Sequence, residues 1–310
     1  MLQICFGPQI HDRSSRFRSA AAGALNSPYF IYLKVLRRRF GGHGPWARAL
    51  DKIASLRALV QVEIETRRAH GVIGEDVLGM AMRARHDDGS PLVDEEIQVR
   101  MIDIIMAGHE TNAVTIAWAC YELCRSRDIM ARTVDEVDRA WDGPASLGAL
   151  QYLSAVCHET LRLHPPNALL TRKVAKAITV CGWEIPPGYG VSMMLPVIHT
   201  RADIYPDPFV FRPERFLERT YAPCEYLPFG GGVKRCVGAA LALDEMMIVV
   251  ASLLRHFRIG LIRDRPVRHA PRSLTVAPAG GVELRLARRV PRDSRSSQEL
   301  HGAGARSDGQ

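Results

Sequence analysis

A single cysteine lies within a glycine-rich loop in the stretch PFGGGVKRCVGA, residues 228–239. Three consecutive glycines precede Cys236, and the apolar run that follows predicts a helix over residues 239–257. A thiolate at the start of a helix is stabilised by the unpaired amides of the first turn and by the helix dipole. Glycines lack a Cβ, so a large flat ligand can approach the backbone closely. Cys236 is therefore a candidate metal ligand or nucleophile, and the alternative is a core cysteine in a turn.

An acid and an alcohol are adjacent in the stretch AGHETN, where Glu110 and Thr111 lie in the middle of a predicted helix. Glycine and threonine weaken a helix interior, and a buried glutamate is costly, so the stretch needs an explanation. The Thr111 hydroxyl can bond the carbonyl of Ala107, and together with Gly108 this would open a local groove. The alternative is a kinked helix with an exposed Glu110.

Charged residues recur in three stretches between these two sites. Glu159 and Arg162 of HETLRLHPP share one helical face, where a surface pair contributes only about 0.2–0.5 kcal/mol. The stretch FRPERF adds Arg215, and LLTRKV adds Arg172. Taken singly, each is equally well explained as an exposed cation or a surface ion pair.

Together and in this order, the motifs resemble those of the cytochrome P450 superfamily. Four residues, Phe229, Gly232, Cys236 and Gly238, occupy the positions that F-x-x-G-x-x-x-C-x-G requires in the haem loop of that superfamily. The resemblance implies that the Cys236 thiolate is the axial ligand of a haem b iron, which favours O–O cleavage, and that Phe229, Gly230 and Gly238 contact the haem. Lys234 departs from the usual arginine; it can pair with a propionate as a point charge but lacks the planar fork.

The resemblance also assigns roles to the helical acid–alcohol pair. Glu110 and Thr111 would relay protons to dioxygen, and Ala107 and Gly108 would form the oxygen-binding groove beside the haem. Asn112 stands where a second threonine is more common. Asn112 in place of threonine would alter the efficiency of proton transfer more than it would remove the relay.

The remaining charged residues receive structural or binding roles by the same resemblance. Glu159, Arg162 and Arg215 would form a network that locks an irregular segment to the core beneath the haem. A desolvated network of this kind is costly to break on one side only. Arg172 would pair with a haem propionate.

Helical periodicity dominates the first half of the chain. We expect helices over residues 45–70, 94–125 and 150–164, with Pro45 at the first start and Gly71 beyond its end. Carboxylates at the start of the second helix suit its exposed amides. The third helix ends at two prolines, because the residue before a proline disfavours the α region.

Short extended runs follow. The sequence predicts a hairpin over residues 177–193 with Pro187 and Gly188 at its turn, and an irregular segment over 201–228. Two weak strands near 273–277 and 282–287 flank the PAGG turn and predict a second hairpin. The fold class is therefore mainly α with small β-sheets: by resemblance a cytochrome P450 fold lacking its N-terminal portion, in a partial domain over 1–287. Residues 288–310 are predicted to form a disordered basic tail.

Composition limits the class of protein without choosing its chemistry. The 310 residues are 47% hydrophobic and 24% charged, which is enough for a large globular core, and the net charge of +8 leaves nucleic acid, lipid and acidic proteins open as partners. Aromatic and basic residues mix in residues 27–46, which we interpret as a solvated basic face. No segment predicts an export signal or transmembrane anchor. Seven cysteines without a CxxC pair suit a reducing cytoplasm.

Competing sites are weaker. Cys120, Cys124, Cys157 and His158 lie on predicted helices and invite comparison with zinc sites, but zinc sites favour short spacers on turns. Cysteine hydrolysis lacks a base placed by sequence context. A lone His199 is interpreted as structural.

Two functions follow as hypotheses. The first is a haem-thiolate monooxygenase that inserts one oxygen atom from O2 into a small apolar substrate, such as a lipid, a terpenoid or steroid, or a xenobiotic. Its electrons would come from a ferredoxin or flavodoxin-like donor with its reductase, docking near Lys234 and Arg235, with no role for nucleic acid. The alternative is a non-catalytic fragment of the same fold that does not hold haem stably.

Overall fold

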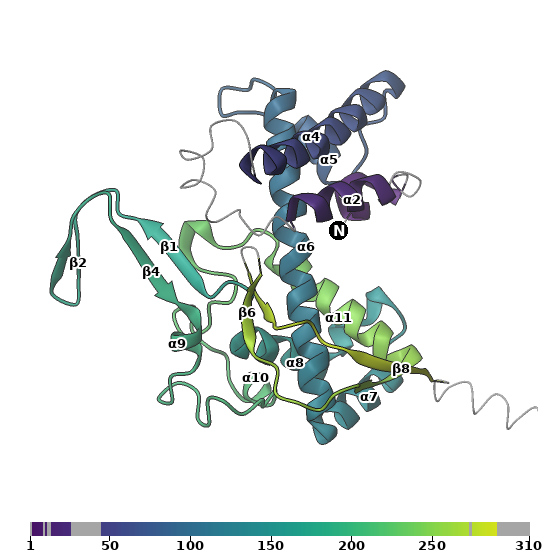
Figure 1. The fold of residues 1–310 in the computed structure, drawn as a ribbon, viewed down its shortest axis with the longest axis vertical. Helices are drawn as coiled ribbons and strands as arrows, with labels where there is room; N and C mark the ends of the chain where they lie inside the picture. Colours follow the sequence, from purple (N-terminus) through teal and green to yellow (C-terminus); the bar gives the residue numbers. More distant parts are fainter. Residues whose placement is uncertain (1, 9, 11–13, 26–44, 273–274, 290–310) are drawn as a thin grey trace, which may run out of the picture. The chain divides into compact units, whose positions relative to one another are not determined.

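The computed structural model describes residues 2–8, 10, 14–25, 45–272 and 275–289 (Figure 1). It divides into two compact units, one comprising residues up to 111 with 271–274, and the other 112–270 with the chain from 275. Most of the predicted basic face and of the predicted tail lie outside the described residues. None of the described helices is both long and apolar enough to cross a membrane.

The first unit is helical. It contains α1 (Leu2–Phe6), α2 (Ser14–Leu25), α4 (Pro45–His70), α5 (Val77–Arg83) and the first part of α6 (Asp94–Arg125). The predicted start of α4 at Pro45 is confirmed, and Gly71 follows its end with a φ of 66°, which glycine adopts without strain. Buried apolar side chains from all five helices form its core.

A buried arginine ties three parts of the first unit together. The Arg67 guanidinium donates to both carboxylate oxygens of Asp76, at 2.7 and 2.8 Å, and to Glu63 at 3.3 Å. It also donates to the backbone carbonyls of Phe6 and Ile73. Because a buried charge is tolerated only when paired and hydrogen-bonded, this arrangement fixes α1 and the loop before α5 against α4.

The second unit holds the remaining helices. They are the rest of α6, α7 (Arg127–Ala140), η2 (Pro144–Ala149), α8 (Gln151–Leu163), α9 (Leu195–His199), α10 (Arg215–Glu218), η3 (Gly232–Lys234) and α11 (Ala239–His256). The predicted helices at 94–125, 150–164 and 239–257 are confirmed to within a residue at each end. The segment 201–228 is irregular apart from the short α10, as predicted.

The strands pair differently from the prediction. They are β1 (Leu169–Lys173), β2 (Ile178–Val180), β3 (Trp183–Ile185), β4 (Gly190–Met194), β5 (Phe257–Leu261), β6 (His269–Arg272), β7 (Thr275–Pro278) and β8 (Leu284–Arg288). In the described chain they form two-stranded sheets, β1–β4, β2–β3, β5–β8 and β6–β7.

Both predicted hairpins were therefore misplaced. The tight turn falls at Cys181 and Gly182, between β2 and β3, with φ angles of 49° and 84°. Pro187 and Gly188 instead lead into β4, which pairs with β1. The strands flanking PAGG belong to different sheets, because β7 pairs with β6 and β8 with β5.

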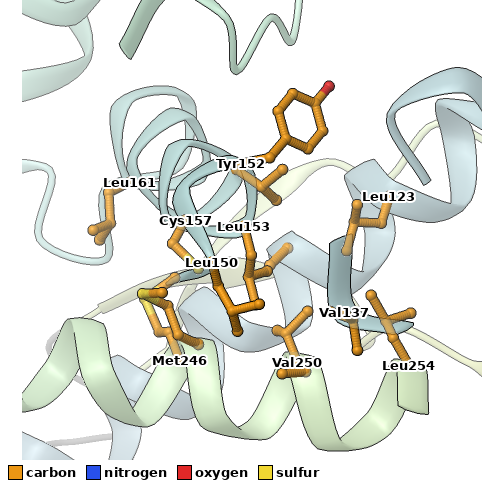
Figure 2. Packing of buried hydrophobic residues seen from close by; sticks show 14 of the residues in the cluster. Leu123, Val137, Leu150, Tyr152, Leu153, Cys157, Leu161, Met246, Val250 and Leu254 are labelled. Carbon is orange, nitrogen blue, oxygen red and sulfur yellow. The ribbon is translucent and has the colours of Figure 1, made fainter. Parts of the chain in front are cut away.

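The core of the second unit forms where α8 meets α11 and α7. Figure 2 shows Leu153 and Cys157 of α8, together with Leu150 just before its start, facing Met246 and Val250 of α11. All five side chains are buried. Burying each large aliphatic side chain contributes about 1.5–3 kcal/mol, so this apolar contact holds α8 and its charged residues in place.

Candidate functional site

The cysteine loop has the backbone form that its glycines predict. Gly230 and Gly232 have φ angles of 69° and 65°, in the left-handed region that favours glycine. The Cys236 amide donates to the Phe229 carbonyl at 2.9 Å, which closes the loop. Helix α11 begins three residues later with Gly238 as its N-cap, so the predicted position beside a helix start is confirmed.

Exposed apolar side chains flank the thiol. Cys236 is exposed, and Val233 and Val237 on either side are 104% and 100% exposed. A Cβ added at Gly232 or Gly238 would meet no atom within 4 Å. The two valines and the open glycine backbone leave the thiol accessible to a flat ligand. A soft sulfur donor in an open, apolar surround fits a flat apolar group that carries iron.

Two exposed cations lie within this loop, and a third lies on β1. Arg172 on β1 is exposed and donates to the neighbouring Thr171 carbonyl at 3.1 Å. Lys234 ends η3 and is exposed, as is Arg235. In the part of the chain that the structure describes, neither Arg172 nor Lys234 forms an ion pair, so both side chains remain available for an anionic group.

The structure brings Glu159, Arg162 and Arg215 into one buried cluster. Arg162 donates to both Glu159 oxygens, from Nε to Oε2 at 2.6 Å and from Nη2 to Oε1 at 2.8 Å. Arg215 Nε donates to Oε1 at 3.0 Å, and the Arg212 amide to the same oxygen at 2.8 Å. The side chains of Glu159 and Arg162 are fully buried and that of Arg215 is 3% exposed. The carboxylate thus accepts four hydrogen bonds, three of them at Oε1.

The remaining guanidinium hydrogens bind backbone carbonyls of the irregular segment and of His199 at the end of α9. Arg162 donates to the carbonyls of His199 and Pro208, both at 2.7 Å. Arg215 donates to those of Pro206, Asp207 and Val210. The network therefore fixes the path of a segment that has almost no regular secondary structure of its own.

His199 also belongs to this network, and its membership was not indicated by the sequence. Its Nδ1 donates to the Arg162 carbonyl at 3.1 Å, and its Nε2 accepts from the Leu227 amide at 3.0 Å. The Leu227 amide can only donate a hydrogen bond, so Nε2 must carry no proton. The imidazole ring is therefore neutral, with its proton on Nδ1. Burial lowers the pKa of His199 to about 4. The structural interpretation of His199 fits this arrangement, and its partners, distant in sequence, left no local signal.

We expect acid to destabilise the second unit through His199. The pKa of His199 is lower in the folded state than the value of 6.5 expected in the unfolded state, so below pH 6.5 the unfolded state binds the proton more readily. The stability contributed by the neutral ring is therefore complete above pH 6.5 and is lost as pH falls toward about 4. The expected loss in free energy of unfolding is about 3 kcal/mol between pH 6.5 and 4. Urea unfolding of wild type and His199→Gln at several pH values measures it. His86→Gln, at an exposed histidine, is the control, and an unchanged pH slope in His199→Gln would contradict the assignment.

The acid–alcohol pair lies in the first unit. The Thr111 hydroxyl donates to the Ala107 carbonyl at 2.6 Å, as predicted, and Ala107 is exposed and Gly108 half-buried. The Glu110 side chain is 10% exposed, and its Oε1 lies 3.1 Å from Nε of Arg272 at the end of β6. The alternative of an exposed Glu110 is therefore wrong. The structure describes this pair and the cysteine loop in separate units.

Asn112 makes a contact that the sequence did not predict. It is buried in the second unit, and its amide nitrogen donates to the Glu245 carboxylate of α11. The residue at the unusual position thus pins the second half of α6 to the helix that follows Cys236. A threonine is too short to make this contact in the same way.

The helical cysteines have the properties of core residues. Burial raises the pKa of Cys120 to about 12 and that of Cys124 to about 11, and it raises the pKa of the fully buried Cys157 further. Zinc binds the deprotonated thiolate, and the raised pKa of these buried thiols keeps them protonated. His158 Nδ1 contacts the Tyr226 hydroxyl at 2.9 Å. No group of three or more metal-binding side chains occurs among the described residues.

Comparison with known proteins decides the family. The cytochrome P450 family model matches residues 32–283, which include the cysteine loop, the buried charge network and the acid–alcohol pair. The chain belongs to the cytochrome P450 family. This P450 chain contains only part of the length of its relatives.

Two relatives come from Mycobacterium tuberculosis strain H37Rv, both with provisional names. Cytochrome P450 135B1 is 32% identical over 98% of this chain and 64% of its own length. Cytochrome P450 137 is 36% identical over 83% of this chain and 52% of its own length. The crystal structure of the cytochrome P450DA heme domain matches 94% of this chain and 66% of its own, with a TM-score of 0.81 and 26% identity. The predicted P450 fold, mainly α with small sheets, is confirmed.

Proposed function

We propose that this P450 is a haem-thiolate monooxygenase. The observation that carries the proposal is the exposed Cys236 thiol, held in a glycine loop between two fully exposed valines. Cys236 would ligate the iron of haem b, and Phe229, Gly230 and Gly238 would line the face beside it. Arg172 and Lys234 would pair with the propionates. When bound, the haem would supply the reductive activation of dioxygen.

The overall reaction sets what the chain's own residues must do. Oxidation of an apolar substrate RH with O2, two electrons and two protons yields ROH and water. Two protons must therefore be delivered to dioxygen. Glu110 would take a proton from solvent at its carboxylate and pass it toward dioxygen, and the Thr111 hydroxyl would be the next hydrogen-bonding group. Ala107 and Gly108 would leave room beside Thr111 for dioxygen.

The finer assignments follow from the same proposal. The substrate would be a small apolar organic molecule, a lipid, terpenoid or steroid, or xenobiotic. Electrons would come from an acidic ferredoxin or flavodoxin-like protein with its reductase, and the exposed Lys234 and Arg235 offer cations for its docking. The seven cysteines, with no CxxC pair among them, support a reducing cytoplasmic location.

A carbon monoxide spectrum of the purified full chain tests the proposal. We expect haemin to bind with one haem per chain, and the dithionite-reduced complex with carbon monoxide to show the red-shifted Soret band of a thiolate ligand. The folded state is checked by circular dichroism. A folded chain that shows no such band would support the alternative, a non-catalytic fragment that does not hold haem stably.

A further inference from the structure

An exposed arginine far along the chain contacts the buried acid of the relay. Arg272 is the last residue of β6, and its side chain is 61% exposed. Its Nε lies 3.1 Å from Oε1 of Glu110, whose side chain is 10% exposed. Both residues belong to the first unit. The pair therefore joins a carboxylate in the helix interior to a cation that is still in contact with water.

This geometry gives the two residues different tasks. A carboxylate removed from water needs a partner for its charge, and an adjacent cation favours its ionised form. A guanidinium stays charged in proteins, so Arg272 cannot itself deliver a proton. Its planar donors can, however, fix the direction of the carboxylate and hold water molecules beside it. Arg272 is thus suited to orient Glu110 and not to replace it.

We propose that Arg272 is a positioning residue that holds the Glu110 carboxylate at the solvent end of the proton relay. The proposal rests on the proposed monooxygenase function. Dioxygen that receives two electrons and two protons without further reduction leaves as hydrogen peroxide, whereas complete reduction with four electrons and four protons gives two waters. A carboxylate that is poorly placed delivers protons late, so more of the oxygen leaves as peroxide.

The first experiment measures hydrogen peroxide released per O2 consumed by the haem-loaded full chain. Electrons come from a [2Fe–2S] ferredoxin with its reductase, and lauric acid serves as the apolar probe. Arg272→Gln is expected to raise the peroxide fraction about twofold and to increase the solvent deuterium isotope effect on O2 consumption. Arg272→Lys, which keeps the cation, should recover most of the wild-type fraction. Arg265→Gln, at an exposed arginine outside the pair, is the matched control.

The second experiment needs no cofactor. Thermal unfolding of wild type, Glu110→Gln, Arg272→Gln and the double variant forms a double-mutant cycle. We expect the two losses in midpoint to be clearly less than additive, because either substitution already breaks the pair. Additive losses, or a peroxide fraction in Arg272→Gln equal to that of wild type, would overturn the proposal. A coupled pair in a chain that binds no haem would instead count against the monooxygenase function, so the two failures are distinguishable.

Discussion

Replacing Glu159 with alanine is expected to unfold the second unit under conditions in which the wild type is fully folded. The change leaves the guanidinium groups of Arg162 and Arg215 buried without a counter-charge. Breaking a buried pair from one side costs about 3–5 kcal/mol. Whole domains are stable by only about 5–15 kcal/mol, so the loss is a large part of the total.

Urea unfolding followed by circular dichroism measures this effect. The control is Glu218→Ala, which removes the partner of Arg212 from an exposed ion pair on the same segment. Exposed pairs contribute about 0–1 kcal/mol, so the control should unfold close to the wild-type midpoint. Equal midpoints for Glu159→Ala and Glu218→Ala would mean that the buried network contributes no more than a surface pair.

Replacing Cys236 with alanine is expected to abolish stoichiometric haem binding and the thiolate-shifted carbon monoxide band. The reason is chemical, because alanine offers the iron no donor atom. The effect on folding should be small, since the side chain is exposed in the chain without haem. The pyridine haemochrome assay measures the haem bound per chain, and the carbon monoxide spectrum measures the loss of the thiolate-shifted band.

A second exposed cysteine provides the matched control. Cys224→Ala removes a thiol from the neighbouring irregular segment and should leave both haem content and spectrum unchanged. If Cys236→Ala retained the shifted band, the axial ligand would be another residue, and the proposed chemistry would lose its basis.

The helices were predictable because their signals are local. Pro45 and Gly71 mark the ends of α4, and a row of carboxylates marks the start of α6. Strand pairing was not predictable in the same way, since a strand can pair with any other strand that the core brings alongside. The turn at Cys181 was missed because a non-glycine residue there adopts a φ of 49°, while the more obvious Pro187 and Gly188 lead into a strand paired elsewhere.

In the candidate site, too, the local features were predictable from sequence and the long-range contacts were not. The glycine loop around Cys236 and the bond from Thr111 to Ala107 lie within short stretches, and sequence reasoning found both. Glu159 and Arg215 were linked only through family resemblance. The contact of Arg272 with Glu110 was missed altogether, because nothing in either local sequence indicates the other. Contacts between distant residues require the fold.

The charge network also has a consequence for biosynthesis. Helix α8 carries Glu159, but donors to its carboxylate, the Arg212 amide and the Arg215 guanidinium, are translated about fifty residues later. Until they emerge from the ribosome, the nascent helix carries an acid and an arginine that lack their full set of partners, with apolar surface beside them. Such partly assembled species are prone to aggregate. Translation that stalls between residues 163 and 215 should therefore yield chains that recruit chaperones or are degraded.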